Sequence, residues 1–293
     1  MTVNKLSFEK KLTRRSFLKR GLTFAAGISV CSLSSYSFFV ERNHIEIKHI
    51  RLSSSRLPSS FKGIRILHLS DIHFGFFYDL DQLQSLVLNI QSLKPDMICF
   101  TGDLIDQDFS ETEATNVSNL LSQIVAPYGK YGVLGNHDYW GNTELVKKCL
   151  TSAGFQVLLN EVTSVRIGNS MIYISGVDDL LGGTPEISKI FNKNKLNPDC
   201  YHILLVHEPD YADEVSYHPV DLQLSGHSHG GQITLPAIGP LITPKLSRKY
   251  HSGLYKINSR LSLYTNRGIG TTILPFRFFC RPEITIIELQ PLT

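Results

Sequence analysis

The sequence of 293 residues predicts a layered α/β fold with mixed sheets, and three observations favour this class. Short apolar runs alternate with amphipathic stretches early in the chain, as in sheets covered by helices. Later apolar runs lie closer together, which is typical of hairpins. Five of these runs end in loops rich in Asp, His or Asn. The composition, 42% hydrophobic and 19% charged, is globular and excludes collagen-like, disordered and polytopic membrane proteins.

The individual elements follow from hydrophobic periodicity and turn chemistry. Residues 41–60 are expected to form an extended lead-in to one folded domain, residues 61–293. Thr143 is expected to cap a helix that Gly154 stops, and Gly168-Asn169 predicts a two-residue hairpin turn. Strands are expected at 64–69, 96–100, 131–134, 201–206, 221–224 and 283–289, a hairpin at 162–175, and helices at 80–93, 111–124, 143–152 and from Thr184-Pro185-Glu186 onward.

Residues 1–40 are predicted to be a targeting segment. They hold seven of the 29 basic residues and one of the 26 acids, so they carry +6 and the remaining chain −3. The run TRRSFLK at residues 13–19 resembles the twin-arginine export signal, and an uncharged stretch, residues 21–40, follows it. About 20 such residues can span a bilayer, so cleavage and anchoring both stay open. We expect export by the twin-arginine machinery to the periplasm, the cell wall or the outer face of the cytoplasmic membrane.

Polar side chains follow five of the predicted strands. Ligand sites in open α/β sheets form where the carboxyl ends of strands meet, so one shared site is expected. Side chains two apart in extended backbone project to the same side, which pairs Asp71 with His73 and His227 with His229. The candidate residues are Asp71, His73, Asp103, Asn136, His137, Asp138, His207, His227 and His229.

The residue types in these loops indicate metal binding. Carboxylate, amide and imidazole ligands without a thiolate favour manganese, iron, zinc, cobalt or nickel over a structural zinc. Seven ligands are too many for one tetrahedral ion and suit two divalent ions that share a bridging carboxylate. Manganese is the preferred candidate. The expected ligands are Asp71, His73, Asp103, Asn136, His207, His227 and His229.

Other polar residues have structural interpretations. His68 and His202 lie inside predicted strands and are expected in the core, while Asp106 and Asp108 are expected to be loop and cap residues. Asp178 and Asp179 are equally consistent with a cleft lining and a turn.

The motif order Asp-x-His, Gly-Asp, Gly-Asn-His-Asp, His, Gly-His-x-His runs from Asp71 to His229. It resembles the signature of calcineurin-like metallophosphoesterases. The leader and the segments 205–210, 226–232, 266–268 and 281–283 resemble the exported YkuE/YaeI-type bacterial phosphodiesterases. The resemblance implies a four-layer αββα sandwich of two mixed sheets flanked by helices, with residues 61–293 as the catalytic domain.

The resemblance also implies residue roles. The first metal would be held by Asp71, His73, Asp103 and His229, and the second by Asp103, Asn136, His207 and His227. His137 would lie beside the substrate phosphate as a catalytic residue, with Asp138 orienting its ring. A hydroxide between the metals would be the nucleophile.

The expected function is therefore a two-metal phosphodiesterase that hydrolyses phosphate esters of the cell envelope. Some relatives cleave UDP-2,3-diacylglucosamine, so a lipid pyrophosphate hydrolase is the alternative. Residues 269–279 are apolar and aromatic; they are expected to pack in the core, or to form an acyl-chain groove at the membrane surface in which Arg267, Arg277 and Arg281 hold a phosphate. A non-catalytic envelope-binding protein should have lost ligands, and none is lost. Nucleic acid is not an expected partner, because no basic stripe remains after the leader.

Overall fold

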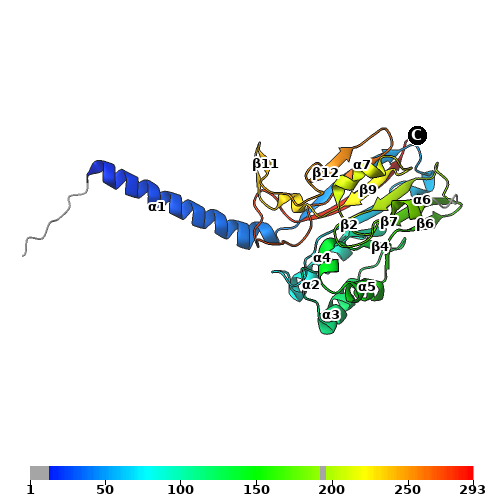
Figure 1. Cartoon of the computed structure of the whole chain (residues 1–293), viewed down its shortest axis with the longest axis horizontal. Helices are drawn as coiled ribbons and strands as arrows, with labels where there is room; N and C mark the ends of the chain where they lie inside the picture. Colours follow the sequence, from blue (N-terminus) through cyan, green and yellow to red (C-terminus); the bar gives the residue numbers. More distant parts are fainter. Residues whose placement is uncertain (1–12, 192–195, 293) are drawn as a thin grey trace, which may run out of the picture.

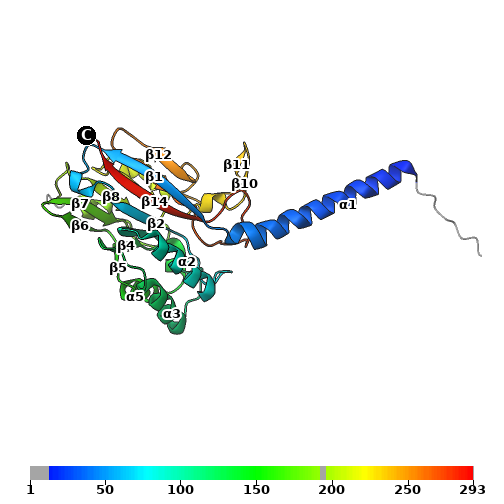
Figure 2. The ribbon, with the colours of Figure 1, turned by 180° about the vertical axis from the view of Figure 1, so that it is seen from behind.

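The computed structural model describes residues 13–191 and 196–292 of the chain. Two six-stranded mixed sheets pack face to face, and helices cover both outer faces (Figures 1 and 2). This four-layer arrangement confirms the predicted fold class. The predicted alternation of strands and helices in the first half of the chain is also confirmed.

The first sheet is built mainly from the N-terminal half of the chain. Its outer face packs against three amphipathic helices, α2 (Leu80–Leu93), α3 (Glu111–Ser122) and α5 (Thr143–Ser152). α5 is capped by Asn142, whose side chain accepts from the Leu145 amide, and not by Thr143 as expected. In spatial order the strands are β1 (Glu46–Ser54), β14 (Glu283–Pro291), β2 (Arg65–Leu69), β3 (Met97–Thr101), β4 (Lys130–Val133) and β5 (Phe155–Val157).

The expected lead-in is part of this sheet. Residues 46–54 pair in parallel with β14 along their full length, so β1 is an edge strand of the domain and not a separate segment. Before it, residues 41–43 form a helical turn rather than extended chain. The membership of β1 in the sheet is not recognisable from the local sequence, because β1 alternates half-buried and exposed residues and pairs with a strand more than 200 positions away.

The second sheet carries the C-terminal ligand loops. The hairpin of β6 and β7 confirms the turn predicted at Gly168-Asn169. The outer face packs against α6 (Ile187–Phe191) and α7 (Ala212–Val215). The strands in order are β12 (Gly253–Lys256), β13 (Ser262–Thr265), β9 (Leu222–Ser225), β8 (His202–Leu205), β7 (Ser170–Gly176) and β6 (Glu161–Ile167). A separate ribbon pairs β10 (Thr234–Leu235) with β11 (Gly239–Pro240).

Within the described residues, the predicted leader forms a long helix that projects from the body (Figure 1). α1 (Arg14–Ser35) buries none of its side chains, and it continues through a wider π-helical turn, η1 (Tyr36–Val40), and a tighter 3₁₀ turn, η2 (Glu41–Asn43). In the described part of the chain, Arg14–Asn43 is the one helix long and apolar enough to cross a membrane. That length and composition also fit a signal sequence. The basic head before Thr13 lies outside the described residues.

Candidate metal centre

The predicted ligands converge because the chain turns sharply where the strands end. Five of the seven have a positive φ, between 48° and 64°, which is strained for residues other than glycine. These turns follow β2, β3 and β9, and they direct the side chains into one space between the loops. The five residues are Asp71, His73, Asp103, His227 and His229.

One group of ligands combines the loops after β2 and β9. The Nε2 atoms of His73 and His229 lie 3.0 Å apart, and His229 Nε2 lies 3.3 Å from Asp71 Oδ1. Asp71, His73 and His229 are buried and bring their ligand atoms within 4.8 Å of one another. This is the set that the resemblance assigned to the first metal, apart from the shared Asp103.

A second group lies beside the first. Asp103, His207 and His227 are also buried and bring their ligand atoms within 4.8 Å of one another. Asp103 Oδ2 lies 3.1 Å from His207 Nε2 and 3.4 Å from His73 Nε2. One carboxylate oxygen thus faces an imidazole of each group, which is the position of a bridging ligand.

The donor set fits divalent cations. Among the described side chains, Asn136 Oδ1 is buried without a hydrogen-bond partner. Three ligand imidazoles also have one nitrogen bonded to a neighbouring oxygen, which fixes the other toward the centre. His73 Nδ1 pairs with Asp106 Oδ1 at 3.1 Å, His207 Nδ1 with the Thr101 carbonyl at 2.6 Å, and His227 Nε2 with the Lys245 carbonyl at 2.9 Å.

The protonation states of two of the four proposed ligand imidazoles suit metal binding. Burial lowers the pKa of His227 to about 3 and that of His229 well below its usual value, so both imidazoles are neutral at pH 7. Neutral imidazole is the form that coordinates metals. Burial alone would lower the pKa of the other two, His73 and His207, but adjacent carboxylates raise both, so a metal would displace a proton there. Burial alone would raise the pKa of Asp103, but the adjacent His207 lowers it well below its usual range and keeps it anionic.

Glycines in the motifs allow the loops to approach this closely. A Cβ at Gly226 would collide with Ser70 Oγ and Asp71 Oδ2, and one at Gly135 would collide with Asp103 Oδ1. The motif glycines are therefore needed for close packing of the ligand loops.

Asp138 does not orient His137, and this expectation was wrong. Asp138 Oδ2 accepts from the amides of Asp103 and Gly135, and Oδ1 accepts from those of Leu104 and Ile105, at 2.9–3.3 Å. These bonds hold the loop after β3 against the start of α4 (Asn136–Trp140). Asp138 therefore shapes the loop that carries Asp103, because its oxygens already serve backbone donors.

Asp106, and not Asp138, contacts the His137 ring and orients it. Sequence reasoning missed this role of Asp106. His137 Nδ1 lies 2.6 Å from the Asp106 carbonyl and 3.5 Å from Asp106 Oδ1. The same carboxylate oxygen pairs with His73 Nδ1. The available signal was its position three residues after Asp103 in the same loop.

The remaining polar residues have structural surroundings. His68 and His202 are buried in β2 and β8, as expected. Asp178 and Asp179 bind backbone amides of residues 179–184, which makes them turn residues. Arg277 is fully buried and donates to the carbonyls of Arg267, Gly268, Gly270 and Cys280.

One alternative for residues 269–279 was a groove in which three arginines hold a phosphate. For Arg277 and Arg267 this expectation is incorrect, because both already have other partners. Arg277 is committed to carbonyls, and Arg267 pairs with Glu46 and Glu283 at 2.6 Å each. The packing interpretation also fails for part of the segment, since Ile273, Leu274 and Phe279 are exposed.

A cavity of about 930 Å³ opens over the two ligand groups. Asp103, Asn136, His137, His227 and His229 form its polar floor. Its walls are largely apolar, with residues from five separate segments: Phe76, Trp140, Leu181, Ile233, Leu241, Ile242, Pro244, Ile273 and Leu274. An anionic group at the floor would thus have apolar surroundings above it.

Residues 64–231 match the family model of the calcineurin-like phosphoesterases. The chain belongs to this family. It is 39% identical to the metallophosphoesterase YkuE of Bacillus subtilis, over 96% of this chain and 99% of that protein. It is 31% identical to the phosphodiesterase YaeI of Escherichia coli, over 95% and 99%. It is 30% identical to the UDP-2,3-diacylglucosamine pyrophosphatase LpxG of Chlamydia muridarum, over 84% and 91%.

Membership in this family makes the chain a metal-dependent phosphoester hydrolase, as the motif order predicted. The family also accounts for the two adjacent groups of ligand atoms, which indicate divalent metal ions.

Proposed function

We propose that this protein is a two-metal phosphodiesterase that is exported by the twin-arginine pathway and acts on phosphate esters of the cell envelope. The main support is Asp103, whose Oδ2 faces both His73 and His207. The name of its relative YaeI, a phosphodiesterase, supports the diester preference.

The proposed ligands are those expected from the sequence. Asp71, His73, Asp103 and His229 would hold one ion, and Asp103, Asn136, His207 and His227 the other. Bound divalent ions, manganese being preferred, would neutralise phosphoryl charge and supply a water of low pKa. His137 would contribute hydrogen bonding to the phosphate or the leaving group, because Asp106 occupies its Nδ1 and leaves Nε2 for the substrate.

Asn136 gives the sharpest test. We expect purified full-length protein in detergent, supplied with Mn²⁺, to hydrolyse bis-p-nitrophenyl phosphate faster than p-nitrophenyl phosphate. Asn136→Ala should lower this rate by about 100-fold, since oriented groups at a charged reaction centre commonly contribute that much. Asn119→Ala, an exposed change on α3, is the matched control. Activity that survives chelation, or that Asn136→Ala leaves intact, contradicts the two-metal mechanism. Wild-type protein that hydrolyses neither substrate would favour the non-catalytic envelope-binding alternative.

A lipid pyrophosphate hydrolase is the second candidate. The apolar walls of the cavity favour it, as does the similarity to LpxG. Hydrolysis of UDP-2,3-diacylglucosamine many times faster than of bis-p-nitrophenyl phosphate would support this candidate over the first.

A further inference from the structure

Six exposed apolar side chains surround the mouth of the cavity on two segments. We call them the apolar rim: Ile238, Leu241, Ile242, Ile273, Leu274 and Phe279. Their exposed fractions reach 78% at Ile242 and 85% at Ile273. Four of the six also line the cavity. Exposed apolar side chains gathered in this way usually mark a contact with a membrane or another molecule.

The two segments of the rim are fastened to each other. Thr234 donates its amide to the Phe278 carbonyl, and the Gln232 side chain pairs with both backbone groups of Thr272. Ile273 has a φ of 62°, a costly conformation for a β-branched residue, and its side chain points into solvent. The rim is therefore held in an exposed position by specific bonds.

The base of the helical leader is attached to the same segments. Glu41 is buried and accepts from the Cys280 amide at 2.8 Å, and the ring of Phe38 lies 5.8 Å from that of Phe276. Figure 1 shows the β10–β11 ribbon and the base of α1 at the same end of the body. The apolar rim and the leader thus share one face.

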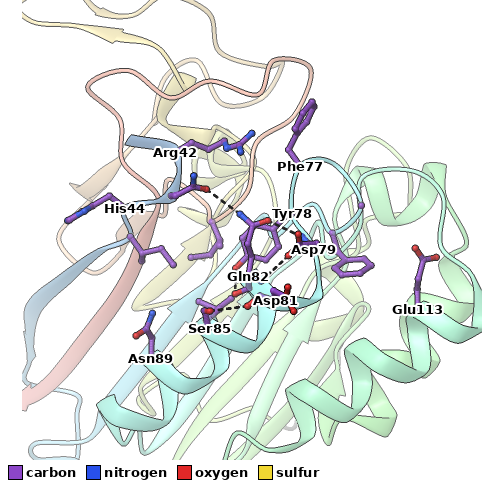
Figure 3. A pocket seen from close by; sticks show the side chains of 16 residues that line it. Arg42, His44, Phe77, Tyr78, Asp79, Asp81, Gln82, Ser85, Asn89 and Glu113 are labelled. Carbon is purple, nitrogen blue, oxygen red and sulfur yellow. Dashed lines mark hydrogen bonds between the residues drawn. The ribbon is translucent and has the colours of Figure 1, made fainter. Parts of the chain in front are cut away.

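The base of the leader also contacts the body on a second side, through the loop before α2 and the first turn of α2. The Arg42 guanidinium lies 4.3 Å from the centre of the Phe38 ring and 5.4 Å from that of Phe77. Gln82 donates to Asn43 at 3.2 Å. Figure 3 shows Arg42, Phe77 and Gln82 around a second cavity, of about 880 Å³, which Asn43 also lines. The base of the leader, residues 38–43, is therefore in contact with the body on both sides.

The positions of the charged residues indicate where a membrane surface would lie relative to the body. The uncharged residues 21–40 end directly at the body, where Glu41 and Arg42 begin. Twenty helical residues span about 30 Å, the thickness of a hydrocarbon core. With α1 across a bilayer, the lipid surface lies at Val40, beside the residues that Phe38 and Glu41 contact.

We propose that the apolar rim is a membrane-contact surface, which dips into the same lipid leaflet from which α1 emerges and opens the catalytic cavity toward lipid. The proposal rests on α1 staying in place as an anchor, and it does not depend on phosphodiesterase activity. A phosphate on a lipid head group would then enter the cavity while its acyl chains remain against the rim.

Trp140 is the one tryptophan of the chain, which makes fluorescence a direct test. Full-length Trp140→Phe protein carrying Ile238→Trp is reconstituted in phosphatidylglycerol–phosphatidylcholine vesicles whose phosphatidylcholine has brominated acyl chains. We expect bromine to remove most of the emission relative to unbrominated vesicles. The matched control is Tyr217→Trp in the same background, an 84% exposed residue that follows α7, away from the end where α1 joins.

Three results would overturn the proposal. If the protein floats with the vesicles but Ile238→Trp is quenched no more than Tyr217→Trp, α1 is an anchor and the rim is not in lipid. If the protein does not float, the anchor itself fails. If Ile238→Cys crosslinks between copies, the rim is a protein interface instead.

Activity provides a separate measurement. The double variant Ile238→Asp, Phe279→Asp changes rim residues that do not line the cavity. We expect it to lose most hydrolysis of a vesicle-borne phosphodiester while its rate on bis-p-nitrophenyl phosphate stays unchanged. Equal rates on the vesicle-borne substrate contradict the membrane-contact proposal. A wild-type protein inactive on both substrates contradicts only the proposed function, because the quenching result stands alone.

Discussion

At the scale of single residues, the proposed metal centre depends on residues that orient the proposed ligands without binding metal themselves. Asp106 holds His73 through its carboxylate and His137 mainly through its backbone carbonyl, with the carboxylate 3.5 Å away, so it links a proposed ligand to the proposed phosphate-binding histidine. Burial would raise the pKa of Asp106, but its bond with His73 lowers it, so the carboxylate is anionic at pH 7. An anionic partner fixes the tautomer of a ligating histidine.

Asp106→Ala is predicted to lower kcat about 10- to 100-fold and to weaken Mn²⁺ binding, because groups that orient metal ligands commonly contribute that much. Metal titration followed by the rate on bis-p-nitrophenyl phosphate measures both effects. Asp108→Ala, at an exposed position in the same loop, should change neither. A fall in kcat with unchanged metal affinity would limit Asp106 to positioning His137.

Sequence reasoning named the proposed ligands and missed the residues that support them, for a physical reason. Asp71, His73 and the other ligands were recognisable because their spacing and order are fixed by the chemistry of two shared metals. The bonds of Asp106 and Asp138 depend on how the left-handed turns after β2 and β3 direct the chain, and a linear pattern does not encode those turns.

At the scale of elements, strands with a strong local pattern were predicted closely and the others were not. β2, β3 and β8 consist mainly of apolar residues, so their burial on both faces is visible in the sequence. β9 has leucine at alternate positions and directly precedes a ligand motif. β12 alternates half-buried and exposed residues in only four positions, and β1 is an edge strand, so both gave weak signals. Their strand conformation depends on a distant partner rather than on local periodicity.

β8 contains a buried histidine that should make folding sensitive to acid. Burial, with a contribution from Arg260, lowers the pKa of His202 to about 3, and Ser175 Oγ pairs with its Nε2 at 2.7 Å. The unfolded chain binds a proton near pH 6.5 and the folded chain does not, so the unfolded state gains stability as the pH falls below about 6.5.

We predict that Tm falls between about pH 7 and about pH 5, and that His202→Gln reduces this fall, because glutamine does not titrate. Thermal unfolding of both proteins at the two values measures the effect. His218→Gln, a half-buried position after α7, serves as the comparison. An unchanged pH dependence in His202→Gln would show that other groups account for the acid sensitivity.

At the scale of the whole molecule, the leader and the body form a continuous structure. Two residues, His44 and Ile45, separate η2 from β1, and β1 pairs along its length with β14. The Glu41 carboxylate accepts from the Cys280 amide at 2.8 Å, inside the body. The helical leader is therefore fixed to the first sheet and to the loop that carries part of the apolar rim.

Glu41→Ala is predicted to loosen this junction, because an unpaired buried amide costs about 1–3 kcal/mol. Limited proteolysis should cut near residues 36–45 several times faster than in the wild type, while the rate on bis-p-nitrophenyl phosphate stays the same. Glu144→Ala, an exposed acid on α5, is the matched control. Equal cleavage rates in the two variants would show that Glu41 does not secure the junction.

The short connection between η2 and β1 has a consequence for substrate choice if α1 remains in the membrane. With two residues between the helical turn and the sheet, the catalytic centre stays at a nearly constant height above the bilayer. Phosphates deep in the cell wall would lie out of reach, and those carried by the membrane would arrive by diffusion in two dimensions. The rate would then follow the number of substrate molecules per unit of membrane area, and the total amount in the compartment would matter little.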